Sequence, residues 1–382
     1  MTDKVAIVSC ECYDPVRIQN SLKELLLKVD GLSSIRSGMR VAIKANLVAA
    51  GTPESAITTH PVVLAALTEL LIERGATVVV GDSAGGPWML SHMNHIYNVS
   101  GMHAIEEAGG ELNRDMTEAD AENPNGVKAK SFRYTAWLDS CDCMINVCKL
   151  KSHGMMTLSN AVKNLFGTVP GILKPEYHYR YPNPNDFADM IVDICEYWKP
   201  VLHICDAVIA MEGNGPTQGR PYPMNALLAS KNPHALDWVA AKMIGADSED
   251  IPTLQAAKRR GLLPDRFEEI PIDGNWQKDT ARDFDRIINR NSTLFSENDT
   301  VFGKIKRGFL TFALGAKPMV TKKECIGCGK CAKICPANAI TMQSGLPIID
   351  RKKCILCFCC QEFCPKGAMK SHRSPIARMI NH

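Results

Sequence analysis

Cysteine is the residue type whose number and spacing in this chain most strongly indicate chemistry. The chain has 16 cysteines, and nine of them fall between Cys325 and Cys364. Eight of the nine form two copies of one pattern, C-x2-C-x2-C-x3-C-P, at 325–336 and 354–365. Residues 1–15 lack the apolar segment of an export signal, so we expect a cytosolic protein. Because cytosolic thiols stay reduced, metal binding explains these cysteines better than disulfides do.

The repeat predicts two 4Fe-4S clusters with crossed ligands. Three thiolates on one tight loop reach three irons of a cubane, while the next helical turn carries the fourth thiolate to the neighbouring cluster. A zinc site would accept C-x2-C pairs, but it explains neither the third cysteine nor the Cys-Pro step. We assign cluster one to Cys325, Cys328, Cys331 and Cys364, and cluster two to Cys354, Cys357, Cys360 and Cys335.

Both motifs resemble those of bacterial-type two-cluster ferredoxins over their whole length. The resemblance implies a small α+β domain that moves single electrons. Between the copies, residues 341–350 (TMQSGLPIID) predict a strand, a turn at Gly345 and a second strand. The ninth cysteine, Cys359, is interpreted as a small apolar side chain pointing away from the cluster, and a role as an alternative ligand stays open.

Residues 1–275 alternate short β-branched segments with amphipathic helical segments. This pattern is typical of an α/β domain with a large, mostly parallel sheet and helices on both faces. Residues 276–320 form a charged connector, and residues 321–372 form the ferredoxin-like domain. The basic, apolar segment 301–318 favours docking between the domains over lying on a membrane. Strands are expected at 5–10, 40–48, 77–83, 143–150, 202–211 and 225–230, and helices at 18–29, 61–75, 186–198 and 234–245.

Composition excludes several classes of partner. Lys+Arg 44 against Asp+Glu 41 leaves a formal charge of +3, which gives no global reason to expect nucleic acid or an anionic membrane. No stretch reaches the length of apolar residues that a membrane span needs. A cytoplasmic location is therefore expected.

Polar side chains gather where the expected strands end, at the sheet edge where ligands bind in open α/β sheets. Lysines at this edge predict a local cationic pocket and an anionic ligand, although each lysine alone could be a solvated surface residue. We expect His153 and His60 to donate protons, with a core or capping role as the alternative for each. The expected ligand-binding residues are Lys44, Asn46, Asp82, Lys149, Lys163, Asn164, Glu212 and Asn214, with Lys151 in the catalytic set.

Two near-matches to known motifs are less informative. GDSAG at 81–85 fits a hydrolase nucleophile elbow, but Gly86-Pro87 follows where a helix should begin. GNGPTQG at 213–219 has its third glycine one residue late, and three prolines prevent the helix that would hold a pyrophosphate, which argues against NAD binding there. The pairs Cys10 with Cys12 and Cys141 with Cys143 are expected on strands as buried thiols, with a metal or redox pair as the alternative.

A set of short motifs identifies a family resemblance over about residues 35–245. The set is KANLV, TTHPVVLAAL, VVVGDS, INVCKLKSHG, LSNAVKNLFG, DAVIAMEGNGPTQG and the helix HALDWVAAKMIG. It resembles a widespread family of proteins of unknown function, mostly from anaerobic bacteria and archaea, whose members often carry a two-cluster ferredoxin domain. The resemblance implies an iron-sulfur redox protein of anaerobic metabolism. Cys148 departs from the proline or small residue expected before KLKSHG.

Three functions are compatible with these features. The first is a cytoplasmic, ferredoxin-coupled oxidoreductase that passes electrons through two clusters to an anionic substrate or a flavin, with a ferredoxin, flavodoxin or reductase as redox partner. The second is an electron-transfer subunit or adaptor without chemistry of its own. The third is a non-redox hydrolase or lyase whose clusters are structural or Lewis-acidic. Full cysteine ligation argues against the Lewis-acid form, because no iron is left open.

Overall fold

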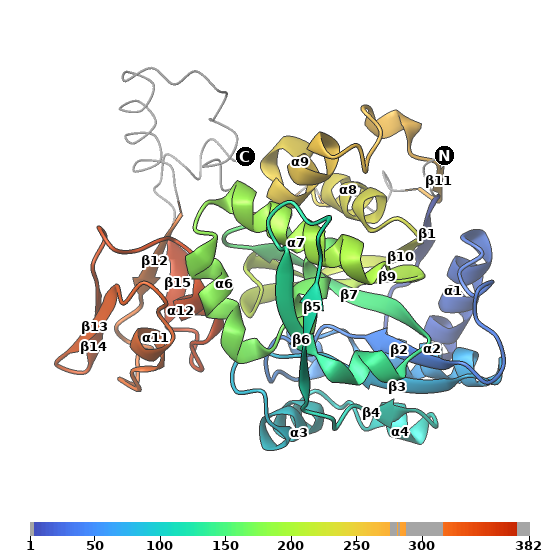
Figure 1. Cartoon of the computed structure of the whole chain (residues 1–382), viewed down its shortest axis with the longest axis horizontal. Helices are drawn as coiled ribbons and strands as arrows, with labels where there is room; N and C mark the ends of the chain where they lie inside the picture. Colours follow the sequence, from blue (N-terminus) through green and yellow to red (C-terminus); the bar gives the residue numbers. More distant parts are fainter. Residues whose placement is uncertain (1–3, 276–280, 282, 288–315, 373–382) are drawn as a thin grey trace.

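A computed structural model describes residues 4–275, 281, 283–287 and 316–372, and it places a large α/β domain beside a small C-terminal domain (Figure 1). The strands of the large sheet are β1 (Val5–Ser9), β2 (Arg40–Lys44), β3 (Thr77–Gly81), β4 (Glu111–Leu112), β7 (Cys143–His153), β8 (Thr157–Ser159), β9 (Leu202–Asn214), β10 (Gln218–Ser230) and β11 (Ile272–Asp273). Their order in the sheet is β11-β1-β10-β9-β7-β2-β3-β4, and β8 pairs with β7 outside this path.

The sheet is mostly parallel, as predicted. β4, β3, β2, β7 and β9 run parallel to one another in this order, and β11 runs parallel to β1. β10 is antiparallel to both β9 and β1, and β8 is antiparallel to β7. A short turn can join antiparallel strands, and β9 and β10 form one long hairpin whose end projects beyond the sheet edge.

The four predicted helices are confirmed, and each begins in the same way. A side chain before the helix caps the first turn, and proline occupies the first turn, where its missing N–H costs nothing. The capping residues are Asp14, His60, Asn183 and Asn232. The helices of this domain are α1 (Pro15–Lys28), α2 (Pro61–Ile72), α3 (Leu90–Val99), α4 (Ala104–Glu107), α5 (Ala161–Asn164), α6 (Lys174–Arg180), α7 (Pro184–Trp198), α8 (Pro233–Met243) and α9 (Pro252–Arg259).

Helices cover both faces of the sheet because successive strand residues point to opposite sides. In β2, Val41 and Ile43 enter the core that α1 and α2 complete. Ala42, between them, enters the opposite core, which includes α7. The α/β class with helices on both faces is therefore confirmed.

Some expected boundaries are wrong. β1 ends at Ser9, so Cys10 and Cys12 follow the strand, and Cys10 is buried whereas Cys12 is exposed. Cys141 precedes β7, which begins at Cys143. These pairs therefore do not share a strand face. The hairpin of β5 (Glu118–Glu122) and β6 (Ser131–Thr135) was not predicted, because the polar sequence EADAE lacks an apolar alternation.

The small domain is α+β and repeats one unit. β12 (Lys317–Val320) pairs with β15 (Met369–His372), and β13 (Ile340–Gln343) pairs with β14 (Leu346–Ile349), the strand–turn–strand predicted around Gly345. Each cysteine motif contains one short helix, α11 (Lys330–Lys333) or α12 (Cys359–Glu362). β12 falls within the range assigned to the connector. The docking prediction for 301–318 lies outside the described residues up to position 315.

Candidate functional site

The end of the β9–β10 hairpin holds the small domain through its second cysteine motif. Gln361 on α12 donates its side-chain N–H to the carbonyls of Asn214 (2.9 Å) and Gly215 (3.3 Å). Gln218, on the other side of the hairpin, donates to the carbonyl of Cys364 (3.1 Å). These buried backbone acceptors are thereby satisfied by side chains of the opposite domain, which fixes the orientation of α12.

Among the described residues of the two cysteine motifs, those of the second motif face the large domain. Phe358, just before α12, is 2% exposed and packs in the same core as α7, next to Gly154. Within the described residues, positions 325–335 make no hydrogen bond or ion pair to the large domain. Figure 1 shows α12 next to α6, with α11 farther out.

A cavity of ≈ 50 Å³ lies between α12 and the carboxyl edge of the sheet. We call it the interdomain pocket. Its wall combines cations, carboxylates and amides from the two domains, and Cys359 and Phe363 close one side. The polar residues that line it are Asn46, Asp82, Ser83, Ser159, Lys163, Asn164, Lys174, His178 and Glu362.

Glu362 brings a carboxylate from the second motif into the pocket wall. Its Oε1 is 3.2 Å from Nε2 of His153, and the Glu362 side chain is 14% exposed. Burial would raise the pKa of Glu362, but His153, Lys163 and His178 together lower it to about 2. The carboxylate is therefore ionised and faces the cations of the large domain.

His153 is held in one orientation by the turn after β7. Its Nδ1 accepts the backbone N–H groups of Met155 (3.1 Å) and Met156 (3.2 Å). The neutral ring therefore carries its proton on Nε2, toward Glu362. Burial, with Lys163 nearby, lowers the pKa of His153 to about 4, so the ring is neutral at pH 7.

Three more basic groups face the pocket without a carboxylate within salt-bridge distance. Lys163 has no hydrogen bond or ion pair among the described residues, and burial lowers its pKa. Burial lowers the pKa of Lys174 to about 8, and its ammonium donates to the carbonyl of Ser83. Burial lowers the pKa of His178 to about 3, and its Nδ1 has no hydrogen-bond partner in the described part of the chain.

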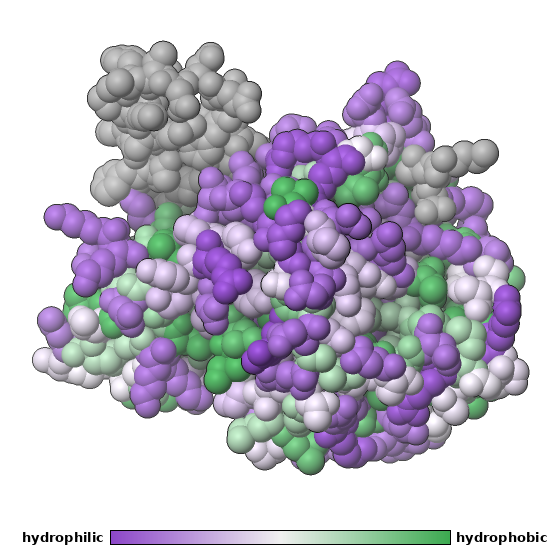
Figure 2. All heavy atoms as spheres, viewed as in Figure 1, coloured by the Kyte–Doolittle hydropathy of each residue, from purple (hydrophilic) through white to green (hydrophobic). Residues whose placement is uncertain are grey.

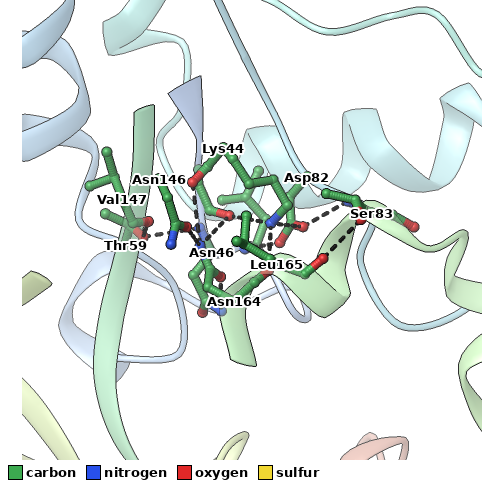
Figure 3. Close-up of polar contacts among 12 residues, drawn as sticks. Lys44, Asn46, Thr59, Asp82, Ser83, Asn146, Val147, Asn164 and Leu165 are labelled. Atoms are coloured by element: carbon green, nitrogen blue, oxygen red, sulfur yellow. Dashed lines mark hydrogen bonds and ion pairs between the residues drawn. The ribbon is translucent and has the colours of Figure 1, made fainter. Parts of the chain in front are cut away.

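Buried amides join the strands below the pocket (Figure 3). Asn164 donates to Oδ1 of Asn146 (2.7 Å) and accepts from Nδ2 of Asn46 (2.9 Å). Asn46 also accepts from the ammonium of Lys151 (2.6 Å). Thr59 accepts the backbone N–H of Asn46 (3.0 Å), which ties the loop before α2 to the end of β2. The network fixes which amide atoms reach the pocket.

Two of the predicted lysines are neutralised rather than free. Lys44 is 2.6 Å from Asp82, and both side chains are buried (Figure 3). Burial still lowers the pKa of Lys44 despite this pairing. A Cβ at Gly167 would lie 2.2 Å from the Asp82 carboxylate, so the pair fits only because this residue is glycine. Asp82 also accepts the backbone N–H of Leu47 (2.6 Å), which secures the loop after β2.

Lys149 and His60 belong to a separate buried network. Lys149 lies 2.9 Å from Asp206 and donates to the hydroxyl of Tyr13 at 2.6 Å. His60 stacks on the Tyr13 ring with centroids 3.6 Å apart and caps α2 through Nδ1. Burial lowers the pKa of His60 to about 4. This network fixes the first turn of α2 to β9, away from the residues that line the pocket.

The remaining predicted residues hold the hairpin and the pocket in place. Lys151 is fully buried and donates to Asn46 and to the carbonyl of Ile57, and burial lowers its pKa well below the usual value. Glu212 pairs with Arg220 across the hairpin at 2.9 Å. Asn214 accepts the backbone N–H of Ser371 (3.1 Å), so this side chain contacts the small domain.

Asp237 on α8 positions the short helix α5. Its carboxylate accepts the backbone N–H groups of Ala161 (2.8 Å) and Val162 (3.2 Å). Burial raises the pKa of Asp237 to about 7. Because α5 carries Lys163 and Asn164, this contact sets where both side chains meet the pocket.

The cysteines surround two further cavities in the small domain. One is lined by Cys325, Cys328, Cys331 and Cys364, together with apolar residues such as Met342. The other is lined by Cys335, Cys354, Cys357 and Cys360, together with Cys359. Four thiols per cavity are a donor set suited to a 4Fe-4S cluster, which supplies single electrons when bound. Cys359 lines both the second cavity and the interdomain pocket.

The sequence analysis did not single out Lys174, His178 or Glu362. Lys174 and His178 lie on α6, which the short segment 174–180 did not predict. Glu362 had an available signal in the repeat, because its counterpart in the first motif is Lys333. A reversal of charge between equivalent positions indicates that the two copies face different surroundings.

A nucleophile elbow, which the sequence GDSAG resembles but Gly86-Pro87 argued against, is not formed at Ser83. β3 ends at Gly81, and the next helix, α3, begins only at Leu90. An elbow needs a strand, a sharp turn and a helix in immediate succession. Residues 213–219 form the end of the β9–β10 hairpin, with Gln218 paired to Asn214. Within the described residues, no helix has the length and apolar content needed to cross a bilayer.

Comparisons with known proteins agree with this architecture. The model of a family described as Domain of unknown function (DUF362) matches residues 41–242, and that of a 4Fe-4S dicluster domain matches residues 324–368. A thylakoid-associated protein of Synechocystis sp. is 32% identical over 293 residues, which cover 72% of this chain and 88% of that protein.

One solved structure shows a weak likeness, the lactate racemase apoprotein from Thermoanaerobacterium thermosaccharolyticum. It has a TM-score of 0.40 and 10% identity, and the match covers 63% of this chain and 56% of that chain. A likeness at this level carries no functional argument. The two family matches and the relative, in contrast, extend over most of the chain. The chain therefore belongs to the family described as Domain of unknown function (DUF362), and it carries a 4Fe-4S dicluster domain at its C-terminal end.

Proposed function

We propose that this iron-sulfur protein is a cytoplasmic oxidoreductase that reduces or oxidises a small anion in the interdomain pocket, one electron at a time. In this proposal, Cys325, Cys328, Cys331 and Cys364 hold one 4Fe-4S cluster, and Cys354, Cys357, Cys360 and Cys335 hold the other. The single observation that carries it is the shared wall: Cys359 lines both the second cysteine cavity and the pocket. Electron transfer falls off with distance, so a shared wall favours chemistry at this pocket.

The charges of the wall support an anionic occupant. Lys163 and Lys174 face the pocket without a carboxylate within salt-bridge distance, whereas Lys44 and Lys149 are neutralised by Asp82 and Asp206. An ammonium group in a partly buried site binds an anion more strongly than it would in water. We therefore assign anion binding to Lys163, with Asn46 and Asn164 as amide donors and acceptors beside it.

We assign proton donation to Lys174 rather than to His153 and His60, the donors expected from the sequence. The pKa of Lys174, lowered by burial to about 8, lies close to neutral pH, where a general acid works best. His153 and His178 are neutral at pH 7, with pKa values of about 4 and about 3. In this proposal His153 positions Glu362, and His60 remains a helix cap.

The size of the pocket favours a small substrate over a flavin. A cavity of ≈ 50 Å³ holds a few water molecules, since one water needs about 10–15 Å³ on the same measure. The tricyclic ring of a flavin is far larger than that. An optical spectrum of anaerobically purified protein tests this point, because a bound flavin would add its own bands to the iron-sulfur absorption.

The decisive experiment measures re-oxidation of the pre-reduced protein by small oxyanions. Anaerobic protein is reduced with dithionite, freed of the reductant and mixed with nitrite, sulfite or bicarbonate, and the visible absorption is followed. We expect at least one anion to re-oxidise the wild type, and Lys163→Gln to slow this reaction about tenfold or more, because one charged contact is lost. The matched control, Lys130→Gln, changes an exposed lysine of the same domain. Equal rates in both variants would contradict the pocket assignment.

A further inference from the structure

Charge is distributed unevenly between the two domains. Residues 316–372 contain ten Lys and Arg against three Asp and Glu, a formal charge of +7 in a chain whose total is +3. The rest of the chain therefore carries a net negative charge. A local field of this kind selects and steers partners even when the total charge is close to zero.

Five of these ten basic residues lie near the cysteines of the first cavity, and Arg351, Lys352 and Lys353 precede the second motif. All five are exposed, and within the described residues none of their ammonium groups has a hydrogen bond or ion pair, so these groups are free to pair with another molecule. Lys330 and Lys366 line the first cysteine cavity itself. We call this surface the basic face, and its residues are Lys322, Lys323, Lys330, Lys333 and Lys366.

The basic face also has the exposed thiol and the apolar contact that an electron-transfer partner needs. Cys328 is exposed, whereas Cys357 and Cys360 of the second motif are buried. Ile326, two residues before Cys328, is 60% exposed. Figure 2 shows hydrophilic residues projecting around smaller hydrophobic areas over the part of the molecule where Figure 1 places the small domain. A charged rim around a small apolar centre is the usual composition of a protein interface.

The opposite side of the small domain is already occupied. Phe358, Gln361 and Glu362 of the second motif contact the large domain. A carrier therefore reaches the thiols of this domain most directly at the first motif. A cluster held by four thiolates adds negative charge there. Each of the five exposed lysines lies within three residues of a cysteine that lines the first cavity, so their positive charge offsets it.

We propose that the basic face docks an acidic one-electron carrier protein, an inference that rests on the proposed function in electron transfer. In each encounter one partner loses the electron that the other gains, and no bond or proton moves. Transient redox complexes bury less than about 1,200 Å² and depend on charge complementarity for their rate of formation. Exposed lysines without ion pairs, close in sequence to an exposed thiol and Ile326, fit that class of partner better than a partner with a large apolar interface.

The test measures docking itself, apart from any turnover. The iron-loaded chain is immobilised, and an acidic flavodoxin is titrated at low and high salt. The test variant combines Lys322→Glu, Lys323→Glu and Lys333→Glu. The matched control makes the same change of charge at exposed lysines of the large domain, with Lys23→Glu, Lys130→Glu and Lys199→Glu. Iron content and visible absorption confirm that each variant is loaded.

We expect the test variant to bind about tenfold more weakly than the wild type at low salt, and the control to stay within about twofold. Wild-type affinity should fall steeply as salt rises, a result that needs no variant at all. Equal losses in both triple variants, or flavodoxin binding that is absent or independent of salt, would overturn the proposal. So would binding of vesicles with 30% phosphatidylserine that is lost in the test variant while flavodoxin does not bind.

The variant Lys163→Gln separates this inference from the proposed function. Lys163 lines the interdomain pocket and is not part of the basic face. Its replacement should leave docking of flavodoxin unchanged within about twofold. Intact docking with failed re-oxidation by every anion would therefore contradict the proposed function alone, whereas the reverse pattern would contradict only the docking proposal.

Discussion

The two copies of the cysteine motif have the same spacing and opposite surroundings. Where the first copy has Gly327 and Gly329, the second has Leu356 and Phe358, and all four residues adopt positive φ, between 55° and 71°. Glycine adopts this backbone without cost, whereas a bulky residue pays about 1–2 kcal/mol. The second copy keeps the strained residues because Phe358 is buried against the large domain.

The difference shows which copy has been adapted to docking. Ala332, Lys333 and Ile334 of the first copy correspond to Gln361, Glu362 and Phe363 of the second. Each of the three second-copy residues contacts the large domain or lines the interdomain pocket. Their first-copy counterparts make no hydrogen bond or ion pair to the large domain among the described residues. Cysteine spacing thus fixes the metal chemistry, and the residues between the cysteines decide what each copy faces.

Removal of the Phe358 ring should have the largest effect on this contrast. Phe358→Ala leaves a cavity in a core where the side chain is 2% exposed, at a cost of about 3–5 kcal/mol of docking and folding free energy. Urea unfolding measures the stability, and small-angle scattering measures the separation of the domains. Ile326→Ala, at a side chain that is 60% exposed, is the first-copy control and should change stability by less than about 0.5 kcal/mol. Similar losses in both would break the comparison.

Acid should destabilise the part of the large domain that faces the second copy, because histidines are buried there. His178 has a folded pKa of about 3 because of burial, below its unfolded value, so the unfolded chain takes up a proton first as pH falls. Its contribution to stability is therefore complete above about pH 6.5 and is lost toward pH 3, by about 1.4 kcal/mol per unit. Unfolding followed by tryptophan fluorescence should show a shallower pH dependence in His178→Phe. A slope unchanged from wild type would show that the ring is not buried as described; His103→Gln, at a half-exposed ring, is the control.

Loss of the Gln361 amide should loosen docking more moderately. Gln361→Ala leaves the buried carbonyls of Asn214 and Gly215 without their donor, a cost of about 1–3 kcal/mol. Hydrogen exchange at residues 213–217 should become faster in this variant. The control is Lys333→Ala, a change at an exposed first-copy position, which should leave exchange in the hairpin unaltered. Protection retained in Gln361→Ala would mean that other contacts hold the hairpin.

The smallest effect is expected from substitutions at the equivalent positions 327 and 356, where φ is positive and only the first copy has glycine. Gly327→Ala forces a Cβ onto a residue with φ of 69° and within 3.0 Å of the Gly345 carbonyl, which should cost about 1–2 kcal/mol. Leu356→Gly relieves strain but loses packing, so its thermal midpoint should shift by only a degree or two. If Leu356→Gly destabilised the protein as much as Gly327→Ala, strain at Leu356 would not be a real cost.

Local features could be predicted from the sequence, whereas contacts between residues far apart in the chain could not. The spacing of Cys325, Cys328 and Cys331 is set within one loop, and capping residues with a following proline mark the helix starts, so both could be predicted. The partner of Lys44 could not, because Asp82 comes next to it only when β2 pairs with β3. Whether a lysine at the sheet edge is free or neutralised depends on such pairing.

The composition of the pocket was beyond sequence reasoning for the same reason. Lys174 and His178 lie on a seven-residue helix, too short to show a clear apolar period, and Glu362 arrives from the other domain. His60 and His153 were equivalent candidates in sequence, and the structure places only His153 against Glu362. The sequence did contain one indication of the Glu362 contact, because the equivalent position of the first copy is the oppositely charged Lys333.

The wall shared through Cys359 couples two processes of the proposed function, anion binding in the pocket and reduction of the second cluster. Under the proposed function, an anion in the pocket would lie next to Cys359, which also lines the cavity of the second thiol quartet. Each electron added on the far side of that wall adds negative charge and weakens the hold on the anion. By reciprocity, a bound anion lowers the reduction potential there by the same free energy. If the proposed function holds, the protein should therefore release an anion more readily once the cluster beside the pocket has been reduced.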